Sequence, residues 1–185
     1  MEAPSNEDPI TLTRHWVERV VIGLNLCPFA KAVQVRGQVR YALSEAASAE
    51  ALLGDLAGEL ARLRDTPAEV LETTLLVHPH VLQDFLDYND FLDIADAALV
   101  ELDLEGVIQV ASFHPDYRFA DSLPEDIENH TNRSPFPMLH LLREDSIDRA
   151  VAAYPDPDAI IGRNQARLRE LGQGGLRRVL RGGDD

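Results

Sequence analysis

Apolar residues at helical spacing mark the beginning of the chain. A helix is predicted to begin at Asp8-Pro9, because a capping side chain there precedes a proline at the first helical position. It is predicted to end near Leu26, because Pro28 disfavours helical backbone in the residue before it. Its apolar positions recur every four residues, at Leu12, Trp16, Val20 and Leu24.

Short apolar and β-branched runs alternate with further helical patterns along the rest of the chain. Four runs predict strands, at residues 39–44, 70–78, 107–113 and 138–143. The second run is almost continuous between Thr73 and Val77, which is typical of a strand buried on both faces. Further helices are predicted from Ser48 to Thr66-Pro67, over 81–102 with a break near Tyr88-Asn89, from Asp145 or Ser146 to before Pro155, and from Asp156-Pro157 to Gly172.

This order of elements predicts an α+β fold. Helices and strands follow one another as α, β, α, β, α, β, β, α, α, so we expect a ferredoxin-like sandwich with additional N- and C-terminal helices. The alternative is a small doubly wound α/β sheet. Residues 9–171 are expected to form one domain between a flexible N-terminus, 1–8, and a flexible Gly- and Arg-containing tail, 172–185.

The composition is that of a globular protein with an acidic surface. Of the 185 residues, 45% are hydrophobic and 26% are charged, and the net charge is −15. This charge argues against binding to nucleic acids or anionic membranes, which both favour basic surfaces. Cys27 is the only cysteine, and we find neither a secretory signal over 1–9 nor an apolar run of ~18 residues, so we expect a cytoplasmic protein.

The polar segment between the third and fourth predicted strands is the main candidate for a functional site. Connections inside compact domains usually have ~4–6 residues, and those beyond ~12–15 are commonly functional or disordered. Tyr117, Phe119 and the rigid run 134–137 favour an ordered loop that packs over the sheet. We therefore place the site at the end of the third strand and in the 114–137 loop.

His114 is the candidate catalytic residue at the end of the third predicted strand, on the same face as Ile108 and Val110. A histidine in this position can titrate near neutral pH, act as a base or bind a metal. Asp116 follows two residues later and is the candidate for orienting it. The alternative is a half-buried histidine that hydrogen-bonds to the backbone.

Arg133 is the candidate for binding an anionic ligand. Its planar guanidinium can bind a carboxylate or a phosphate through two parallel hydrogen bonds. The alternative is that it pairs with a nearby acid such as Asp116 or Glu128. The predicted ligand-binding residues are Arg133, Asn132, Ser134 and Tyr117.

Cys27 is a candidate nucleophile assisted by His114, because catalytic partners need to be neighbours only in space. The run Cys27-Pro28-Phe29-Ala30 resembles the Cys-Pro-aromatic motif of single-cysteine glutaredoxins. In those proteins the motif opens a helix, whereas here it follows one. The alternative is that Cys27 continues the apolar stripe of the first helix and packs as a small hydrophobic residue.

His78-Pro79-His80 places two histidines on the same side of an extended chain at the end of the second predicted strand. Together with His114, and with His140 on the fourth strand, they can be drawn as a three-histidine site for zinc or iron. His78 and His114 are therefore the candidate metal ligands, and a divalent metal is the candidate cofactor. The alternative is that these histidines share no site.

Several segments also match the motifs of a known family. They are the residues from Gly23 to Ala30 (GLNLCPFA), from Phe113 to Tyr117 (FHPDY), from Thr131 to Pro135 (TNRSP) and from Leu139 to Glu144 (LHLLRE). Through them the chain resembles the uncharacterised domain-of-unknown-function family 1415 over about residues 10–171. The resemblance implies a free-standing single domain and carries no activity and no catalytic residue with it.

Two functional hypotheses follow from these residues. The first is an enzyme acting on a small anionic metabolite, with His114 as base or metal ligand and Arg133 with Asn132 as the anion-binding group. Cys27 or a metal would then supply the reactive group. The second is a non-catalytic regulatory module that binds a ligand or a protein, since a fold does not fix a function.

Overall fold

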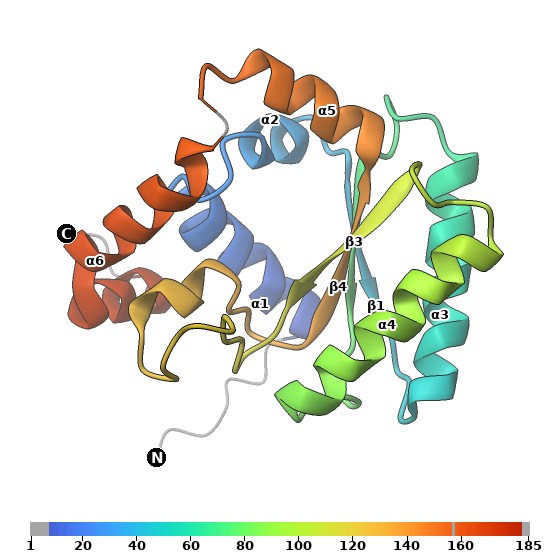
Figure 1. The fold of residues 1–185 in the computed structure, drawn as a ribbon, viewed down its shortest axis with the longest axis horizontal. Helices are drawn as coiled ribbons and strands as arrows, with labels where there is room; N and C mark the ends of the chain where they lie inside the picture. The colour runs from blue at the N-terminus through green and yellow to red at the C-terminus, as the bar shows by residue number, and fades with distance from the viewer. Residues whose placement is uncertain (1–7, 157, 183–185) are drawn as a thin grey trace.

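A four-stranded sheet forms the centre of the structure, a computed structural model that describes residues 8–156 and 158–182 (Figure 1). The predictions for 1–7, Pro157 and 183–185 lie outside the described residues. β1 and β2 are parallel, and β4 runs antiparallel to both β2 and β3. The strands are, in their spatial order, β1 (Val39–Leu43), β2 (Thr73–Val77), β4 (Met138–Arg143) and β3 (Ile108–Phe113).

The predicted α+β class is confirmed, whereas the ferredoxin-like sandwich and the doubly wound sheet are not. The parallel strands β1 and β2 are joined by α3 (Ala49–Asp65) and are direct neighbours. The parallel strands β2 and β3 are joined by α4 (Phe85–Glu101), and β4 lies between them. The sheet thus combines one plain βαβ unit with one split unit, and its antiparallel strand lies inside the sheet.

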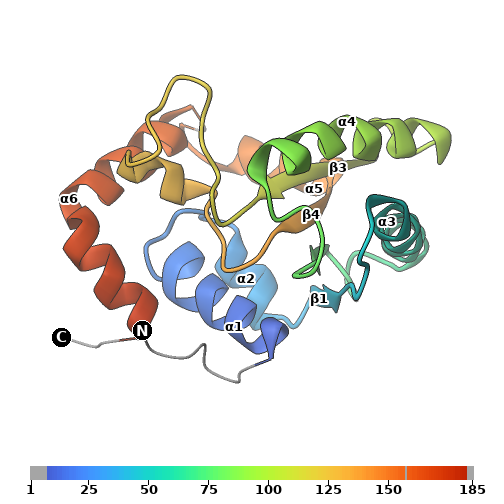
Figure 2. The same ribbon diagram turned by 90° about the horizontal axis from the view of Figure 1, so that it is seen from below.

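Helices cover both faces of the sheet (Figures 1 and 2). On one face α3 and α4 bury a core that includes Leu56, Leu76 and Phe91. On the other face a second core lies beneath three helical elements, α1 (Pro9–Trp16), the π-helix η1 (Val17–Ile22) and α6 (Ala159–Arg181). Because both faces are covered, every residue of β2 is buried, as the sequence predicted for this strand.

The N-terminal helix begins as predicted and ends earlier. The Asp8 side chain accepts a hydrogen bond from the Thr11 N–H at 3.2 Å, with Pro9 as the first helical residue. The predicted end near Leu26 is wrong, because α1 passes into η1 and helical structure stops at Ile22. At the end of the π-helical turn η1, the Gly23 N–H donates a hydrogen bond to Glu18 O at 3.0 Å. The acceptor lies five residues back, whereas in an α-helix it lies four residues back.

Two further helix predictions need correction. The break expected at Tyr88-Asn89 is wrong, since α4 continues through Tyr88, whose side chain is fully buried. Gly172 interrupts the last helix with a φ of 66°, but helical structure resumes and reaches Arg181 because Leu176 is buried in the second core. The sequence missed α2 (Ala30–Val35) and the 3₁₀-helix η2 (Ile127–Thr131), while α5 (Glu144–Ala153) begins next to its predicted start.

Arg143 fastens the end of β4 to the segment that precedes β2. Its guanidinium donates hydrogen bonds to three backbone carbonyls, those of Leu63 at 2.6 Å, Thr66 at 2.5 Å and Leu71 at 2.9 Å. The first two carbonyls belong to the C-terminal end of α3, where carbonyl groups have no partner within the helix. Arg143 therefore has a structural role.

The Tyr88 hydroxyl lies between the facing residues of β3 and β4. It accepts a hydrogen bond from the Phe113 N–H at 3.0 Å and donates one to Met138 O at 2.8 Å. Phe113 and Met138 are partners in the antiparallel register, at the end of the pair where the 114–137 loop leaves and returns. A helix side chain thus takes part in the hydrogen bonding of the sheet at the base of this loop.

We expect replacement of Tyr88 by Phe to reduce the free energy of unfolding by about 1–3 kcal/mol, because a buried donor and a buried acceptor lose their partner. Urea denaturation measures this loss, and faster amide hydrogen exchange at Phe113 should accompany it. The matched control is Tyr154→Phe, because the only partner of the Tyr154 hydroxyl among residues 8–156 and 158–182 is the exposed Arg163. An equal loss in both variants would contradict the structural role given to the Tyr88 hydroxyl.

Candidate functional site

The carboxyl ends of β2 and β3 meet at one edge of the sheet and carry His78 and His114. The two strands lie on either side of the beginning of β4, where Met138 pairs with both Val77 and Phe113. The His78 N–H also donates to Pro137 O at 3.0 Å. Both imidazoles pack against the Tyr88 ring, with centroid separations of 5.9 Å for His78 and 5.0 Å for His114.

His114 is fully buried and uses both ring nitrogens in hydrogen bonds to the backbone. Nε2 lies 3.1 Å from Leu82 O, which can only accept, so Nε2 carries the proton. Nδ1 accepts a hydrogen bond from the Asp116 N–H at 3.0 Å. The pKa of His114 is lowered by burial, which favours this neutral form. In this arrangement neither nitrogen is free to accept a proton or to bind a metal.

His78 has one free nitrogen. Its Nδ1–H donates to Val81 O at 3.1 Å, while Nε2 is buried and has no hydrogen-bond partner. Burial lowers the pKa of His78 to about 4, so the ring is neutral near pH 7. The structure therefore holds an unprotonated imidazole nitrogen in the interior beside Tyr88.

The histidines of the predicted metal site do not form one cluster. Among the described residues, no group of three or more His, Cys, Asp or Glu side chains is arranged to hold a metal ion. The His80 imidazole lies 3.3 Å from a carboxylate oxygen of Glu45 at the surface. His140 lies on the opposite face of the sheet, next to Phe113, with its Nε2 2.8 Å from the Thr73 hydroxyl.

Cys27 lies apart from His114. It is a half-buried free thiol in the turn between η1 and α2. Its neighbours in sequence, Leu24 and Leu26, pack into the core on the α1 and α6 side, whereas the His114 ring faces α4. The structure does not bring the thiol and the imidazole together.

Asn129 organises the 114–137 loop and was not singled out from the sequence. Its side chain is fully buried, and its Oδ1 accepts hydrogen bonds from the Phe119 N–H at 3.1 Å and the Ser122 hydroxyl at 2.6 Å. Its Nδ2 donates to Leu123 O at 2.7 Å. The one feature of the sequence that could have indicated this role is the residue type. Asparagine side chains commonly form hydrogen bonds to nearby backbone groups, and Asn129 lies within a long polar stretch.

Three of the four predicted ligand-binding residues use their side chains for hydrogen bonds or ring contacts with other residues of the protein. The Asn132 Nδ2 donates to Ser112 O at 3.0 Å, and the Ser134 hydroxyl donates to Phe136 O at 2.7 Å. The Tyr117 ring contacts Phe85 edge-on, with 5.4 Å between the centroids. These side chains shape the loop and fasten it to β3 and α4.

Arg133 is the fourth predicted ligand-binding residue, and backbone carbonyls hold its guanidinium. Its Nε donates to Tyr117 O at 3.0 Å and one Nη to Pro124 O at 2.6 Å. Within the described residues it forms no ion pair with Asp116 or Glu128, and Glu128 pairs with Arg169 instead. Burial lowers the pKa of Arg133, and the nearby Asp116 opposes this shift. The other Nη makes no hydrogen bond with the described part of the chain.

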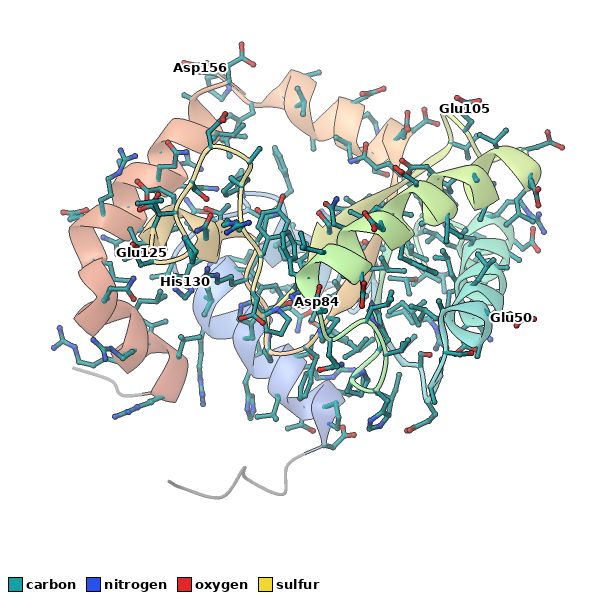
Figure 3. The ribbon with its side chains drawn as sticks, turned by 60° about the horizontal axis from the view of Figure 1, so that its bottom comes forward. Glu50, Asp84, Glu105, Glu125, His130 and Asp156 are labelled. Atoms are coloured by element: carbon teal, nitrogen blue, oxygen red, sulfur yellow. The ribbon has the colours of Figure 1, made fainter. Side chains whose placement is uncertain are left out.

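A cleft of about 380 Å³ opens between the beginning of α4 and the loop. Figure 3 shows Asp84 at the start of α4, with His130 on the loop opposite. The Asp84 carboxylate caps α4 by accepting hydrogen bonds from the Leu86 and Asp87 N–H groups at 2.8 and 3.2 Å. The cleft is lined by Asp84, Phe85, Leu86, Asp116, Arg118, Pro124 and Arg133.

Fold and cleft together define a mixed α+β protein whose sheet is covered on both faces and whose longest loop forms one wall of a polar cleft. The model of the family described as "Protein of unknown function (DUF1415)" matches residues 8–178, and the chain belongs to this family, as its motifs indicated. No curated protein and no solved structure matches the chain. No helix among the described residues is long and apolar enough to cross a membrane.

The buried neutral His78 predicts a dependence of stability on pH. The pKa of its imidazole is near 4 in the folded chain and about 6.5 in an unfolded one, so between these values only the unfolded chain takes up the proton. The free energy of unfolding should therefore fall as the pH drops from 6.5 towards 4, by up to ~1.4 kcal/mol per pH unit for this one group.

The free energy of unfolding of the His78→Asn variant should fall less steeply over this pH range. Asparagine can keep the hydrogen bond to Val81 O, and it does not titrate. Urea denaturation at several pH values between 6.5 and 4.5 measures the slopes. His80→Asn is the control, since the His80 side chain is 57% exposed. A slope for His78→Asn that equals the wild-type slope would show that the burial of His78 does not set this dependence.

Proposed function

We propose that the protein binds a small anionic molecule in the cleft between α4 and the 114–137 loop, with Arg133 as the main anion-binding group. One observation carries the proposal. Two backbone carbonyls fix the Arg133 guanidinium at the cleft wall, and one of its nitrogens is left without a partner among the described residues. A guanidinium held in this way loses little side-chain freedom when it binds a carboxylate or phosphate.

Arg118 supports the same conclusion. It is exposed, lines the same cleft and forms no ion pair with any described residue. In a chain with a net charge of −15, the two arginines of this cleft balance its two acids, so an anion meets less repulsion here than over the acidic surface as a whole.

The two acids of the cleft narrow the class of ligand. Asp116 is exposed at the cleft. Asp84 uses Oδ1 to cap α4, and its Oδ2 accepts no hydrogen bond from the described residues. Carboxylates accept hydrogen bonds, so they favour a ligand that carries a hydroxyl or ammonium group in addition to its anionic group. The proposed ligand class is therefore that of small hydroxy acids, amino acids or their phosphate esters.

Binding without chemistry fits the geometry better than the enzyme hypothesis. His114 would have to give up its hydrogen bond to Leu82 or to Asp116 before it could act as a base. Cys27 lies in the turn between η1 and α2 and does not line this cleft. The proposal keeps Arg133 as a ligand-binding residue. It gives Asp116, first a candidate for orienting His114, a ligand-binding role, and it assigns His114 to holding the two cleft walls together.

The test uses O-phosphoserine as a probe, because it combines a phosphate, a carboxylate and an ammonium group. Binding is measured by isothermal titration calorimetry, and backbone amide shifts in NMR spectra locate it. We expect Arg118→Gln to weaken binding by about tenfold, because a charge-assisted hydrogen bond contributes about 1.5–3 kcal/mol. Arg133→Gln should weaken it further, and a thermal melt checks that the loop still folds.

Arg149→Gln is the control for the change in charge, since Arg149 is exposed and, within the described part of the chain, bonds only to Ser146 on its own helix α5. It should bind the probe as the wild type does. The proposal fails if O-phosphoserine does not bind at millimolar concentration. It also fails if the Arg118 and Arg133 variants bind as well as the wild type, or if the shifted amides lie away from the cleft.

A further inference from the structure

A second pocket lies on the other face of the sheet, between the N-terminal helices and the end of α6. Its volume is about 470 Å³, which is within the range of small-molecule sites, ~300–1,000 Å³. Figure 2 shows the C-terminal end of α6 beside the N-terminal helices that form the other wall. Leu12, Trp16 and Leu180 provide apolar surface in this pocket.

The ionisable side chains of this pocket all belong to basic residues. His15, Arg19 and Arg181 line it, and none of its lining residues in the described part of the chain is an acid. Neither arginine forms an ion pair with any described residue. A basic pocket of this kind stands out in a chain with 32 acidic and 17 basic residues.

Two glycines allow the pocket to form. Gly23 closes the π-helical turn that carries Arg19, and a Cβ atom there would lie 2.1 Å from Arg19 O. Gly182 ends α6 with a φ of 71°, and a Cβ atom at this position would lie 2.6 Å from Arg19 Cζ. The Arg19 side chain can therefore lie against the end of α6. π-Helical turns occur frequently at functional sites.

We infer that this pocket binds an amphipathic organic anion, a molecule with an aromatic or alkyl body and one carboxylate or sulfonate group. The apolar body would lie against Trp16, Leu12 and Leu180, and the anionic group would bind to Arg19 and Arg181. The inference is independent of the α4 cleft, because the two sites share no lining residue.

Trp16 provides a direct measurement of binding. It is the only tryptophan in the chain and it lines this pocket, so its fluorescence reports on an occupant. The probe is 4-phenylbutyrate, and the matched neutral probe is 4-phenyl-1-butanol, which has the same body without the charge. We expect saturable quenching by phenylbutyrate at millimolar concentration or below, with an affinity about tenfold higher than that of the alcohol.

Variants of the two arginines test the anionic contact. Arg19→Gln and Arg181→Gln should each weaken phenylbutyrate binding by about tenfold and leave the affinity for the alcohol unchanged. Arg167→Gln on the same helix is the control, because Arg167 pairs with Glu170 and does not line the pocket. Because Arg19 packs against Gly182, the exposed Arg181 keeps the test valid if Arg19→Gln disturbs the helix end.

Three results would overturn the inference. The first is the absence of saturable quenching by phenylbutyrate at millimolar concentration. The second is equal affinity for the acid and the alcohol, which would remove the role of the basic residues. The third is undiminished binding of phenylbutyrate to the Arg181 variant when the thermal melt shows a folded protein. None of these results bears on the α4 cleft, which the O-phosphoserine titration tests separately.

Discussion

The Tyr88 hydroxyl joins the two strands from which the main loop of this protein leaves and to which it returns. Its hydrogen bonds to Phe113 and Met138 place a helix side chain within the β3–β4 pairing. The same ring packs against His78 and His114, so the strand ends, the loop and the beginning of α4 all meet at one residue. The position of the cleft walls depends on this contact, because Asp84 and Phe85 lie one helical turn before Tyr88 and Asp116 lies just after His114.

The 114–137 loop connects the two proposed sites without belonging wholly to either. Arg133 lines the α4 cleft, and Pro135, two residues later, lines the pocket on the opposite face. Between them Ser134 is buried and closes a short turn onto Phe136. The segment that returns to β4 therefore passes around the edge of the sheet. It contributes Arg133 to the α4 cleft on one face and Pro135 to the pocket on the other.

The spacing of apolar residues predicted most helices and strands that bury one face. It predicted little of how these helices and strands are arranged in space. The fourth strand matches its predicted bounds, and the caps at Asp8 and Ser48 are present, because each rests on local chemistry. Apolar spacing of four cannot distinguish a π-helical turn from an α-helical one, and a short helix such as α2, which has no buried residue, leaves no pattern. His114 was correctly placed at a strand end, but its partners at Leu82 and Asp116 depend on how two loops meet in space.

The burial of neutral imidazoles makes the folded chain more acidic than its amino-acid composition implies. The composition corresponds to an isoelectric point near 4.7, a pH at which free histidines are almost fully charged. Desolvation lowers the pKa of His78, His130 and His140 to about 4, so the native protein lacks much of that positive charge there. Native isoelectric focusing should therefore place the folded protein on the acidic side of the same chain focused in urea.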